Sequence, residues 1–221
     1  MSSENLEKRA PGRPRDEDAL AKRSEAILDV AVQVFADRGF AAADVQEIAD
    51  KAGVGKGTIY RHFESKERLF LAAAELGVTK LRAQINAAAD AAADPLERIR
   101  AAMIAFLAFF DQHPEFVELV IQERAHFRDR QTPTFFQRDP ESEKEQEWDD
   151  SLRDMMRSGI LRQLPTDQIM DALCHFGFGA IFVNYFSGRK KTLAQQAQEM
   201  NDIVFHGILN PNYDPARPTR D

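Results

Sequence analysis

Apolar residues recur along most of the chain at intervals of three and four, which is the spacing of one face of an α-helix. The clearest case is a helix predicted for residues 18–38, whose apolar face carries Ile27, Ala31, Val34 and Phe35. Gly39 follows directly and predicts the end of this helix, because glycine accepts the left-handed conformation found at helix ends. No segment alternates apolar and polar residues as a half-buried strand does. The pattern predicts an all-α protein.

Helix-start and helix-stop residues divide the chain into about nine predicted helices. Asp94 and Pro95 supply an N-cap and a first-turn proline for one of them, and Thr192 with Gln195 forms a capping box for the last. The predicted helices cover residues 18–38, 45–52, 56–63, 65–81, a segment from 95, a segment from 113, 139–159, 166–187 and 192–209.

Two of these helices are short and meet at a tight turn. Ala49 is small where the helices would cross most closely, Gly53 can adopt a positive φ, and Ile59 is an apolar residue that faces back into the core. This spacing is typical of a helix-turn-helix, whose second helix enters the DNA major groove. An ordinary helical hairpin inside a bundle has the same spacing and is the alternative interpretation.

The residues around the second short helix favour DNA binding. Residues 55–67 read Gly-Lys-Gly-Thr-Ile-Tyr-Arg-His-Phe-Glu-Ser-Lys-Glu, which closely resembles a pattern of the TetR family of bacterial repressors. The resemblance covers about residues 26–70, and residues 205–209 add only a generic closing segment. It implies a dimer, a C-terminal ligand-binding domain and release from DNA when a ligand binds.

The resemblance suggests four segments in the chain. We expect a flexible basic arm at residues 1–17, a helix-turn-helix domain at 18–64, a ligand-binding and dimerisation domain at 65–210, and a disordered tail at 211–221. One position departs from the family pattern, because Gly55 stands where the family usually has serine. Glycine has no side-chain oxygen to cap the recognition helix, so we expect a looser helix start until DNA is bound.

Several side chains of the matched stretch are expected to contact DNA. By resemblance, four of them contact phosphates or the groove edge: Thr58, Tyr60, His62 and Lys66. Lys56, Gly57 and Gln46 are candidates for reading bases, with lysine suited to guanine and glutamine to adenine. A purely phosphate-binding Lys56 is the alternative. The complete expected set is Arg13, Arg15, Gln46, Lys56, Gly57, Thr58, Tyr60, Arg61, His62 and Lys66.

The N-terminal arm carries a second DNA-binding pattern. Residues 11–15, Pro-Gly-Arg-Pro-Arg, resemble the core of an AT-hook, whose arginines enter a narrow A·T-rich minor groove. The alternative is a disordered tail that does not contact DNA.

The C-terminal half is rich in aromatic residues, which predicts an apolar pocket between helices for a small molecule. Ordinary core packing explains most of the same residues. The candidate pocket residues are Phe106, Phe110, His113, Phe127, Trp148, Met155, His175 and Phe178. A metal site formed by His113, His126 and His175 is not expected, because no pair of ligands stands four residues apart on a helix. No cofactor is expected.

The last two predicted helices, 166–187 and 192–209, are apolar enough to need a partner surface. Gly177 and Gly179 allow close helix approach, and Met200, Ile203, Val204 and Ile208 lie on one stripe. By resemblance these helices form the homodimer interface. Burial within the same subunit is the alternative.

Bulk composition limits the other functional classes. The net charge of −7 disfavours a nucleic-acid binder, but cations cluster near the N-terminus and around residues 56–68 while acidic residues concentrate at 139–150. The single cysteine, the lack of an apolar N-terminal leader and the lack of an apolar run of ~18 residues indicate a cytoplasmic protein without a membrane partner. Cys174 and His175 are consecutive, so they point in different directions on a helix and form no catalytic dyad.

The sequence therefore predicts a dimeric transcriptional repressor, and not an enzyme. It is expected to bind a palindromic DNA operator and to be released by a small, mainly apolar effector. A constitutive DNA-binding protein without a ligand is the alternative.

Overall fold

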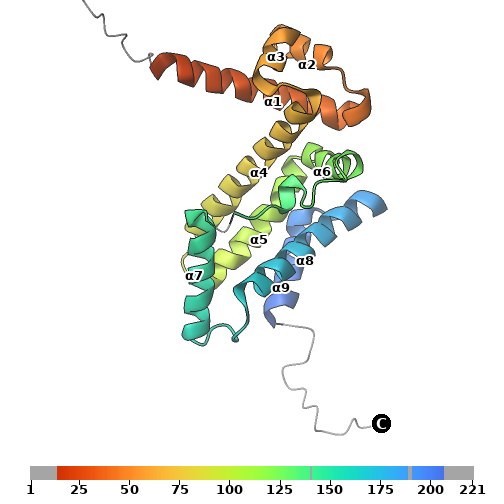
Figure 1. Cartoon of the computed structure of the whole chain (residues 1–221). Helices are drawn as coiled ribbons and strands as arrows, with labels where there is room; N and C mark the ends of the chain where they lie inside the picture. Colours follow the sequence, from red (N-terminus) through yellow and green to blue (C-terminus); the bar gives the residue numbers. More distant parts are fainter. Residues whose placement is uncertain (1–13, 140, 189–190, 207–221) are drawn as a thin grey trace, which may run out of the picture. The chain divides into compact units, whose positions relative to one another are not determined.

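The computed structural model describes residues 14–139, 141–188 and 191–206, and this part of the chain forms α-helices and one 3-10 turn without any strand (Figure 1). An all-α protein with nine α-helices in these residues confirms the predicted fold class. The elements are α1 Pro14–Ala42, α2 Val45–Lys51, α3 Lys56–Phe63, α4 Lys66–Asp90, α5 Pro95–Gln112, α6 Glu115–His126, the 3-10 turn η1 Thr134–Phe136, α7 Glu143–Arg157, α8 Thr166–Ser187 and α9 Leu193–His206.

The predicted capping residues explain where several helices begin. Asp44 accepts a hydrogen bond from the backbone N–H of Gln46 at 2.8 Å, and Asp94 accepts from the N–H groups of Leu96 and Glu97. Thr192 and Gln195 exchange the two hydrogen bonds of a capping box, at 3.1 and 3.2 Å. These three helix starts are confirmed.

Other boundaries differ from the sequence prediction. α1 begins at Pro14, four residues before the expected start, because proline is favoured in the first helical turn. The acidic helix α7 begins at Glu143 and not at residue 139, since Ser142 is the residue that caps it, accepting from the N–H of Glu145. The predicted end of α9 at residue 209 and the tail at 211–221 lie outside the described residues.

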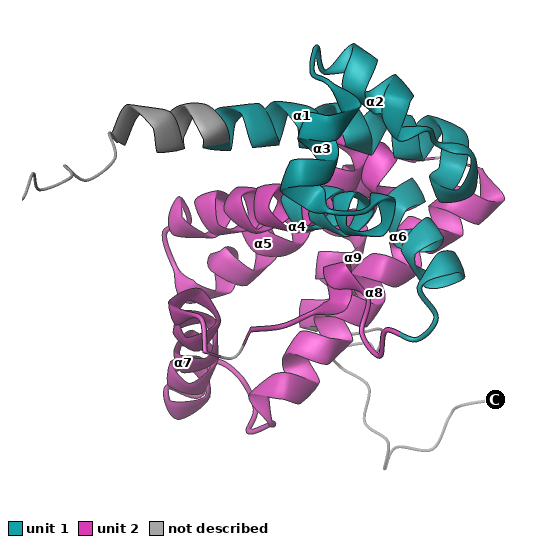
Figure 2. Ribbon diagram, turned by 45° about the horizontal axis from the view of Figure 1, so that its top comes forward, with its two compact units in different colours: residues 1–76, 118–129 teal, residues 77–117, 130–221 magenta. Residues whose placement is uncertain are grey.

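The chain divides into two compact units, coloured separately in Figure 2. Unit 1 comprises residues 1–76 and 118–129, and unit 2 comprises residues 77–117 and 130–221. The C-terminal part of α6 therefore packs with the N-terminal helices. This is a division by packing, and the functional domains expected from the sequence stay a prediction.

Unit 1 is built on an apolar core to which α1, α2, α3 and α4 all contribute. The predicted face of α1 is buried as expected, with Ile27, Ala31, Val34 and Phe35 fully inaccessible to solvent. α2 contributes Ile48 and Ala49, α3 contributes Ile59, and α4 contributes Leu69 and Phe70.

At the break in α1 at Gly39, a side chain from α6 forms hydrogen bonds with the backbone on both sides. Gly39 has φ 76° and ψ 153°, so the helical hydrogen-bond ladder is interrupted there. The N–H of Phe40 donates to Oε1 of Gln122 at 2.8 Å, and Nε2 of Gln122 donates to the carbonyl of Phe35 at 2.9 Å. One amide thus satisfies a backbone donor and a backbone acceptor on either side of the break.

Unit 2 has two apolar clusters. In the first, Ile99 and Met103 of α5 pack with Leu152, Met155 and Met156 of α7. The second is aromatic, with successive ring centroids 4.2–6.1 Å apart, and consists of Phe106, Phe109, Phe110, Phe116, Phe135, Phe136, Phe178 and Phe182.

Two glycines let these aromatic rings pack directly against helix backbones. A Cβ added at Gly77 would lie 2.4 Å from the Phe116 ring, and one added at Gly177 would lie 2.5 Å from the Phe106 ring. The aromatic cluster is therefore closely filled at these two positions.

Candidate DNA-binding site

The helix-turn-helix is formed by α2, α3 and the turn between them. Ala49 and Ile59 are buried, at 0% and 1% exposure, so they occupy the core positions predicted for them. Gly53 has φ +67°, the left-handed conformation expected for the turn. The N–H of Val54 closes the turn by donating to the carbonyl of Ala49 at 3.0 Å.

The start of α3 lacks a side-chain cap, as the departure at Gly55 predicted. Gly55 is the N-cap residue and makes no side-chain hydrogen bond. The first intrahelical contact is instead a tight one, from the N–H of Thr58 to the carbonyl of Gly55 at 2.8 Å. The first backbone amides of α3 are consequently left for solvent or for DNA.

Carboxylates hold both of the long side chains expected to read bases. Nζ of Lys56 lies 3.3 Å from Oδ1 of Asp44, and Nε2 of Gln46 donates to Oδ1 of Asp50 at 2.7 Å. The hydrogen bond from the backbone N–H of Gln46 lowers the pKa of the Asp44 carboxyl below its ordinary value, and the hydrogen bond from Lys56 lowers it further. Asp44 is therefore ionised at neutral pH, and it would compete with DNA for Lys56 if Lys56 makes the contact predicted for it.

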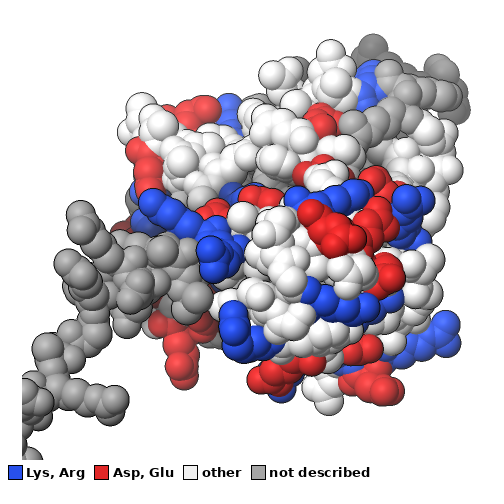
Figure 3. Space-filling model, turned by 90° about the horizontal axis from the view of Figure 1, so that it is seen from above, with Lys and Arg blue, Asp and Glu red and all other residues white. Residues whose placement is uncertain are grey.

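The remaining candidates on α3 present polar groups to solvent. Tyr60 is 40% exposed and Arg61 is exposed, while Thr58 and His62 are half-buried. Seen from above, cationic and acidic side chains are interleaved on the surface in view (Figure 3). The face in view thus carries charges of both signs.

Lys66 contacts the protein itself. Its Nζ donates to the carbonyl of Ala41 at 3.1 Å and lies 5.0 Å from the centroid of the Phe40 ring. Lys66 therefore ties the start of α4 to the end of α1, a role that no pattern in the sequence indicated. The junction before it is strained, because Glu64 is a non-glycine residue with φ +64°.

The arm residues fall at the edge of the structure. Arg13 lies outside the described residues, as does most of the predicted AT-hook at 11–15. Arg15 lies in the first turn of α1.

Comparison with known proteins identifies the family of this fold and motif. The family model for bacterial regulatory proteins of the tetR family matches residues 27–73. The transcriptional repressor KstR2 of Mycolicibacterium smegmatis is 30% identical over 199 residues, which cover 88% of this chain and 94% of KstR2. The chain belongs to the TetR family of bacterial regulatory proteins.

Two further relatives of this TetR-family protein are informative. The transcriptional activator FasR of M. smegmatis is 38% identical over 109 residues, 49% of this chain, and the chain thus spans only about half, 48%, of FasR. The crystal structure of FadR from Bacillus subtilis in complex with stearoyl-CoA has a TM-score of 0.65 and 18% identity, covering 84% of this chain and 99% of that one. The likeness to FadR concerns the fold.

The eight candidate pocket residues of this TetR-family chain do not gather at one place. Phe106, Phe110 and Phe178 share the aromatic cluster of unit 2, and the His113 ring lies 4.9 Å from Phe109 of that cluster. The other four lie elsewhere, in the α5–α7 cluster, in unit 1 or at the surface: Trp148, Met155, Phe127 and His175. A ligand pocket in this half of the chain stays a prediction.

Phe127 shows why aromatic density along the sequence does not identify which residues share one cluster. Its ring packs 5.1 Å from Phe40 and 5.4 Å from Phe70, both in unit 1. Helical spacing indicates that a residue is buried, but not which core buries it.

Histidine and cysteine chemistry finds little support in the described residues. They contain no group of three His, Cys, Asp or Glu side chains placed to hold a metal ion. Burial raises the pKa of the Cys174 thiol, which keeps it protonated and weakly nucleophilic at neutral pH.

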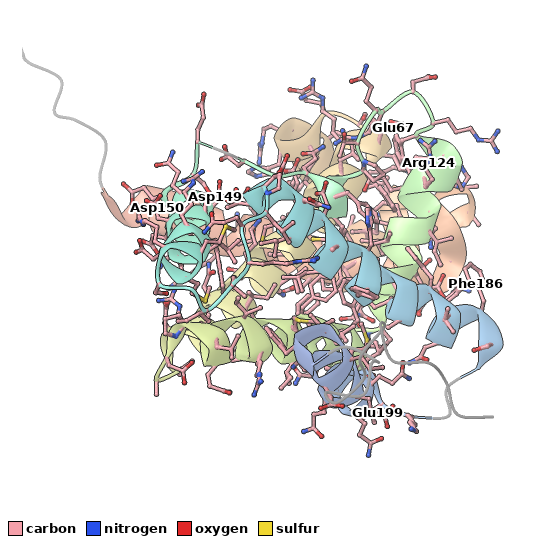
Figure 4. The ribbon with its side chains drawn as sticks, turned by 90° about the horizontal axis from the view of Figure 1, so that it is seen from below. Glu67, Arg124, Asp149, Asp150, Phe186 and Glu199 are labelled. Atoms are coloured by element: carbon pink, nitrogen blue, oxygen red, sulfur yellow. The ribbon has the colours of Figure 1, made fainter. Side chains whose placement is uncertain are left out.

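α8 leaves an apolar face exposed. Phe176, Val183 and Phe186 are 51%, 64% and 74% exposed, and Phe186 is labelled on α8 in Figure 4. With Ala172 and Gly179, which are also exposed, they follow a four-three-four-three spacing on one side of the helix. Such a face is expected to be covered by another surface.

By length and composition alone, α8 is also the one helix among the described residues that qualifies as a membrane span, which the sequence prediction had not anticipated. Packed helices of soluble proteins meet the same criteria, so this property is only a weak indication of a membrane.

Proposed function

We propose that the protein is a dimeric transcriptional repressor that binds a palindromic DNA operator and is released by a small, mainly apolar effector. The observation that carries this proposal is α3, whose exposed polar residues stand on a buried helix-turn-helix core with the family's motif. The DNA contacts are made by Gln46, Lys56, Gly57, Thr58, Tyr60, Arg61, His62 and Lys66, together with Arg13 and Arg15 of the arm.

Repression, as opposed to activation, is supported by the relatives. KstR2, which is named a repressor, aligns over 94% of its own length, whereas FasR, which is named an activator, aligns over 48%. The alignment with KstR2 includes the C-terminal half, so it is a better indication of the regulatory response than the alignment with FasR, which covers half of that relative.

Dimerisation through α8 and α9 is supported by the exposed apolar face of α8 and by Ile203 of α9, which is 50% exposed. Two copies related by a two-fold axis would cover these residues reciprocally. Release by an apolar effector is supported by the aromatic cluster of unit 2 and by the B. subtilis FadR structure, which is a complex with stearoyl-CoA.

The test begins with selection of bound sites from randomised duplex DNA by the full chain. We expect a palindrome, and we expect Lys66→Ala to weaken binding to all sequences and to reduce the salt slope by about one unit. Lys191→Ala removes the same charge from the exposed segment before α9 and is the matched control. Equal salt slopes for the two variants would assign Lys66 to the α1–α4 contact alone.

A constitutive DNA-binding protein is the second candidate, favoured by the close packing of aromatic rings against Gly77 and Gly177. A library of hydrophobic compounds, screened by thermal shift and then by operator gel shift, separates the two functions. Compounds that stabilise the protein and lower operator affinity support the ligand-responsive repressor. The absence of any such compound supports the constitutive protein.

A further inference from the structure

Two carboxylates hold Gln46 at the start of α2 (Figure 1). The backbone N–H of Gln46 donates to Oδ1 of Asp44 at 2.8 Å, and Nε2 of its side chain donates to Oδ1 of Asp50 at 2.7 Å. Gln46 and Asp50 are both exposed and stand four residues apart, the spacing at which two side chains meet on one face of a helix. The side-chain contact therefore lies at the surface of the helix-turn-helix and belongs to α2 alone.

Asp50 differs from the other acidic residue of α2. Glu47 pairs with a cation, because Nζ of Lys51 lies 2.9 Å from its Oε1, whereas Asp50 holds the neutral amide of Gln46. Asp50 also lies in the last turn of α2, where the helix dipole disfavours a negative charge. The carboxylate thus contributes little to the stability of the helix, and its contact with Gln46 is the interaction that distinguishes it.

The contact with Asp50 decides which way the Gln46 amide faces. An ionised carboxylate only accepts hydrogen bonds, so the NH₂ group of the amide faces Asp50 and the oxygen faces away from it. A glutamine amide without such a partner can turn by half a rotation, because its last torsion angle is roughly two-fold. The NH₂ group has two hydrogens, so one N–H and the oxygen of Gln46 stay available to a ligand.

The two orientations of a glutamine amide suit different base pairs in the major groove. In one orientation, an N–H and the oxygen match N7 and N6 of adenine, which is the bidentate contact that glutamine makes with this base. In the reversed orientation, the oxygen matches N4 of cytosine and the NH₂ group matches O6 of the paired guanine. An amide that is free to turn therefore accepts either base, whereas an amide held in one orientation favours one of them.

We propose that Asp50 is a specificity-determining residue of the DNA-binding site, which fixes the Gln46 amide in the orientation that reads adenine. Asp50 acts through the side chain that it contacts, so it is a positioning residue and does not itself contact the base. This role rests on the reading of a base by Gln46 in the proposed function. Without Asp50, the same glutamine would distinguish adenine from cytosine less well.

The test selects bound sites from randomised duplex DNA with the full chain and with its variants. Gln46→Ala identifies the operator position that Gln46 reads, where we expect adenine in the wild-type site. Asp50→Ala should lower the preference for adenine over cytosine at that position by about fivefold or more, the lower end of the discrimination by one bidentate contact. Asp50→Asn keeps an oxygen that can accept from Gln46, so it should retain more of this preference than Asp50→Ala.

Glu47→Gln is the matched control, because it removes one negative charge from the same helix without touching the Gln46 amide. It should raise the affinity for all sequences, as Asp50→Asn should, but it should leave the preferred base unchanged. Chemical denaturation should show that Asp50→Ala does not lower the free energy of unfolding, because alanine favours a helix and the lost charge opposed the helix dipole. A merely structural role of Asp50 would change stability and leave the base preference as it is.

The double variant with Gln46→Ala and Asp50→Ala separates positioning from direct contact. If Asp50 acts through Gln46, its replacement changes nothing further once Gln46 is gone. A further change in base preference in the double variant would make Asp50 itself a base reader and would overturn the inference. An unchanged adenine preference in Asp50→Ala, or no effect of Gln46→Ala on any position, would overturn it as well. A palindrome selected by the full chain in these cases would leave the proposed function intact, whereas selection of no site at all would overturn both.

Discussion

At the residue scale, the two side chains proposed to read bases are held by the protein's own carboxylates. Asp44 holds Lys56, and Asp50 holds Gln46. Sequence reasoning chose Lys56 and Gln46 for their chemistry and did not anticipate these partners. Asp50 lies four residues after Gln46 on α2 itself, whereas the contact of Asp44 with Lys56 depends on how the start of α3 lies against α2. If Lys56 reads a base, as we propose, DNA must first displace its contact with Asp44.

Asp44→Asn should strengthen DNA binding for all sequences. Asparagine keeps an oxygen for the N-cap of α2 but loses the charge that holds Lys56. A freed lysine neutralises one more phosphate, so the slope of log affinity against log salt should steepen by up to about one unit. Fluorescence anisotropy with a labelled operator over a salt series measures both effects, with Asp149→Asn on α7 as the control for net charge.

The pH dependence of this effect follows from the Asp44 pKa, which the Gln46 and Lys56 hydrogen bonds lower from its ordinary value of 3.8. The carboxylate stays charged between about pH 6 and pH 8, so the gain from Asp44→Asn should not vary over that range. Weaker binding by the variant would instead mean that Asp44 orients Lys56 for its contact with DNA.

Gly53 and Gly57 form a matched pair for separating folding from DNA contact. A Cβ would meet nothing within 4 Å at either position, but only Gly53 has a positive φ, of +67°. Gly53→Ala should lower the free energy of unfolding by about 1–2 kcal/mol, the cost of left-handed backbone for an L-residue. Gly57→Ala should raise it by about 0.5–1 kcal/mol, because alanine favours the helix.

Chemical denaturation and operator binding of both variants check this pair. If α3 enters the major groove with Gly57 against the DNA, then Gly57→Ala is more stable and yet binds DNA more weakly. A variant that is more stable and binds normally would remove Gly57 from the contact surface.

At the scale of elements, local signals predicted most of the helices and long-range contacts decided the rest. Asp44, Gly53 and Asp94 act on their own helix ends, so their sequence context was enough to predict them. Gln122 bonds to Phe40 and Phe35, which are 82 and 87 positions away. No periodicity in the sequence reports a contact of this range.

Gln122→Met should destabilise unit 1 while keeping the volume of the side chain. The variant leaves the Phe40 N–H and the Phe35 carbonyl without their partner at the break in α1. Leaving buried backbone groups unpaired costs about 1–3 kcal/mol. Urea denaturation should show this loss, and Gln198→Met, at an exposed position of α9, should show none. Equal midpoints for the two variants would mean that water replaces the amide.

At the scale of the whole molecule, the unpartnered surface is the apolar face of α8. The sequence predicted that α8 and α9 need a partner, but their composition could not distinguish burial within the subunit from burial between subunits. The structure leaves Phe176, Val183 and Phe186 exposed on the chain by itself. A face of this kind on a TetR-family protein suits a second copy of the same chain, because a two-fold axis brings identical stripes together.

Gly177 and Gly179 test this interface from opposite sides of one helix. A Cβ at Gly177 meets the Phe106 ring at 2.5 Å, whereas a Cβ at Gly179 meets nothing within 4 Å. Gly177→Ala should therefore destabilise the fold of each chain at any protein concentration. Gly179→Ala should leave the isolated chain unharmed and weaken only the association, because the added methyl group separates the two α8 helices. Thermal melts over a range of protein concentrations distinguish the two effects.

Val183→Glu gives the most direct test of the interface, because Val183 is 64% exposed and the folded chain has room for a carboxylate there. Two glutamates facing each other across a two-fold axis would be buried without a partner, so the variant should sediment as a monomer. The half-sites of the palindrome are expected to have centres about 34 Å apart or a multiple of that distance. A monomer contacts only one of them, so its affinity for the full palindrome should fall towards its affinity for a single half-site. Gln146→Glu adds the same charge at an exposed position of α7, outside the proposed interface, and should keep the wild-type mass and affinity. A wild-type protein that sediments as a monomer and binds the half-site and the palindrome equally would contradict the dimer. Partition of that monomer into lipid vesicles would assign the apolar face of α8 to a membrane surface.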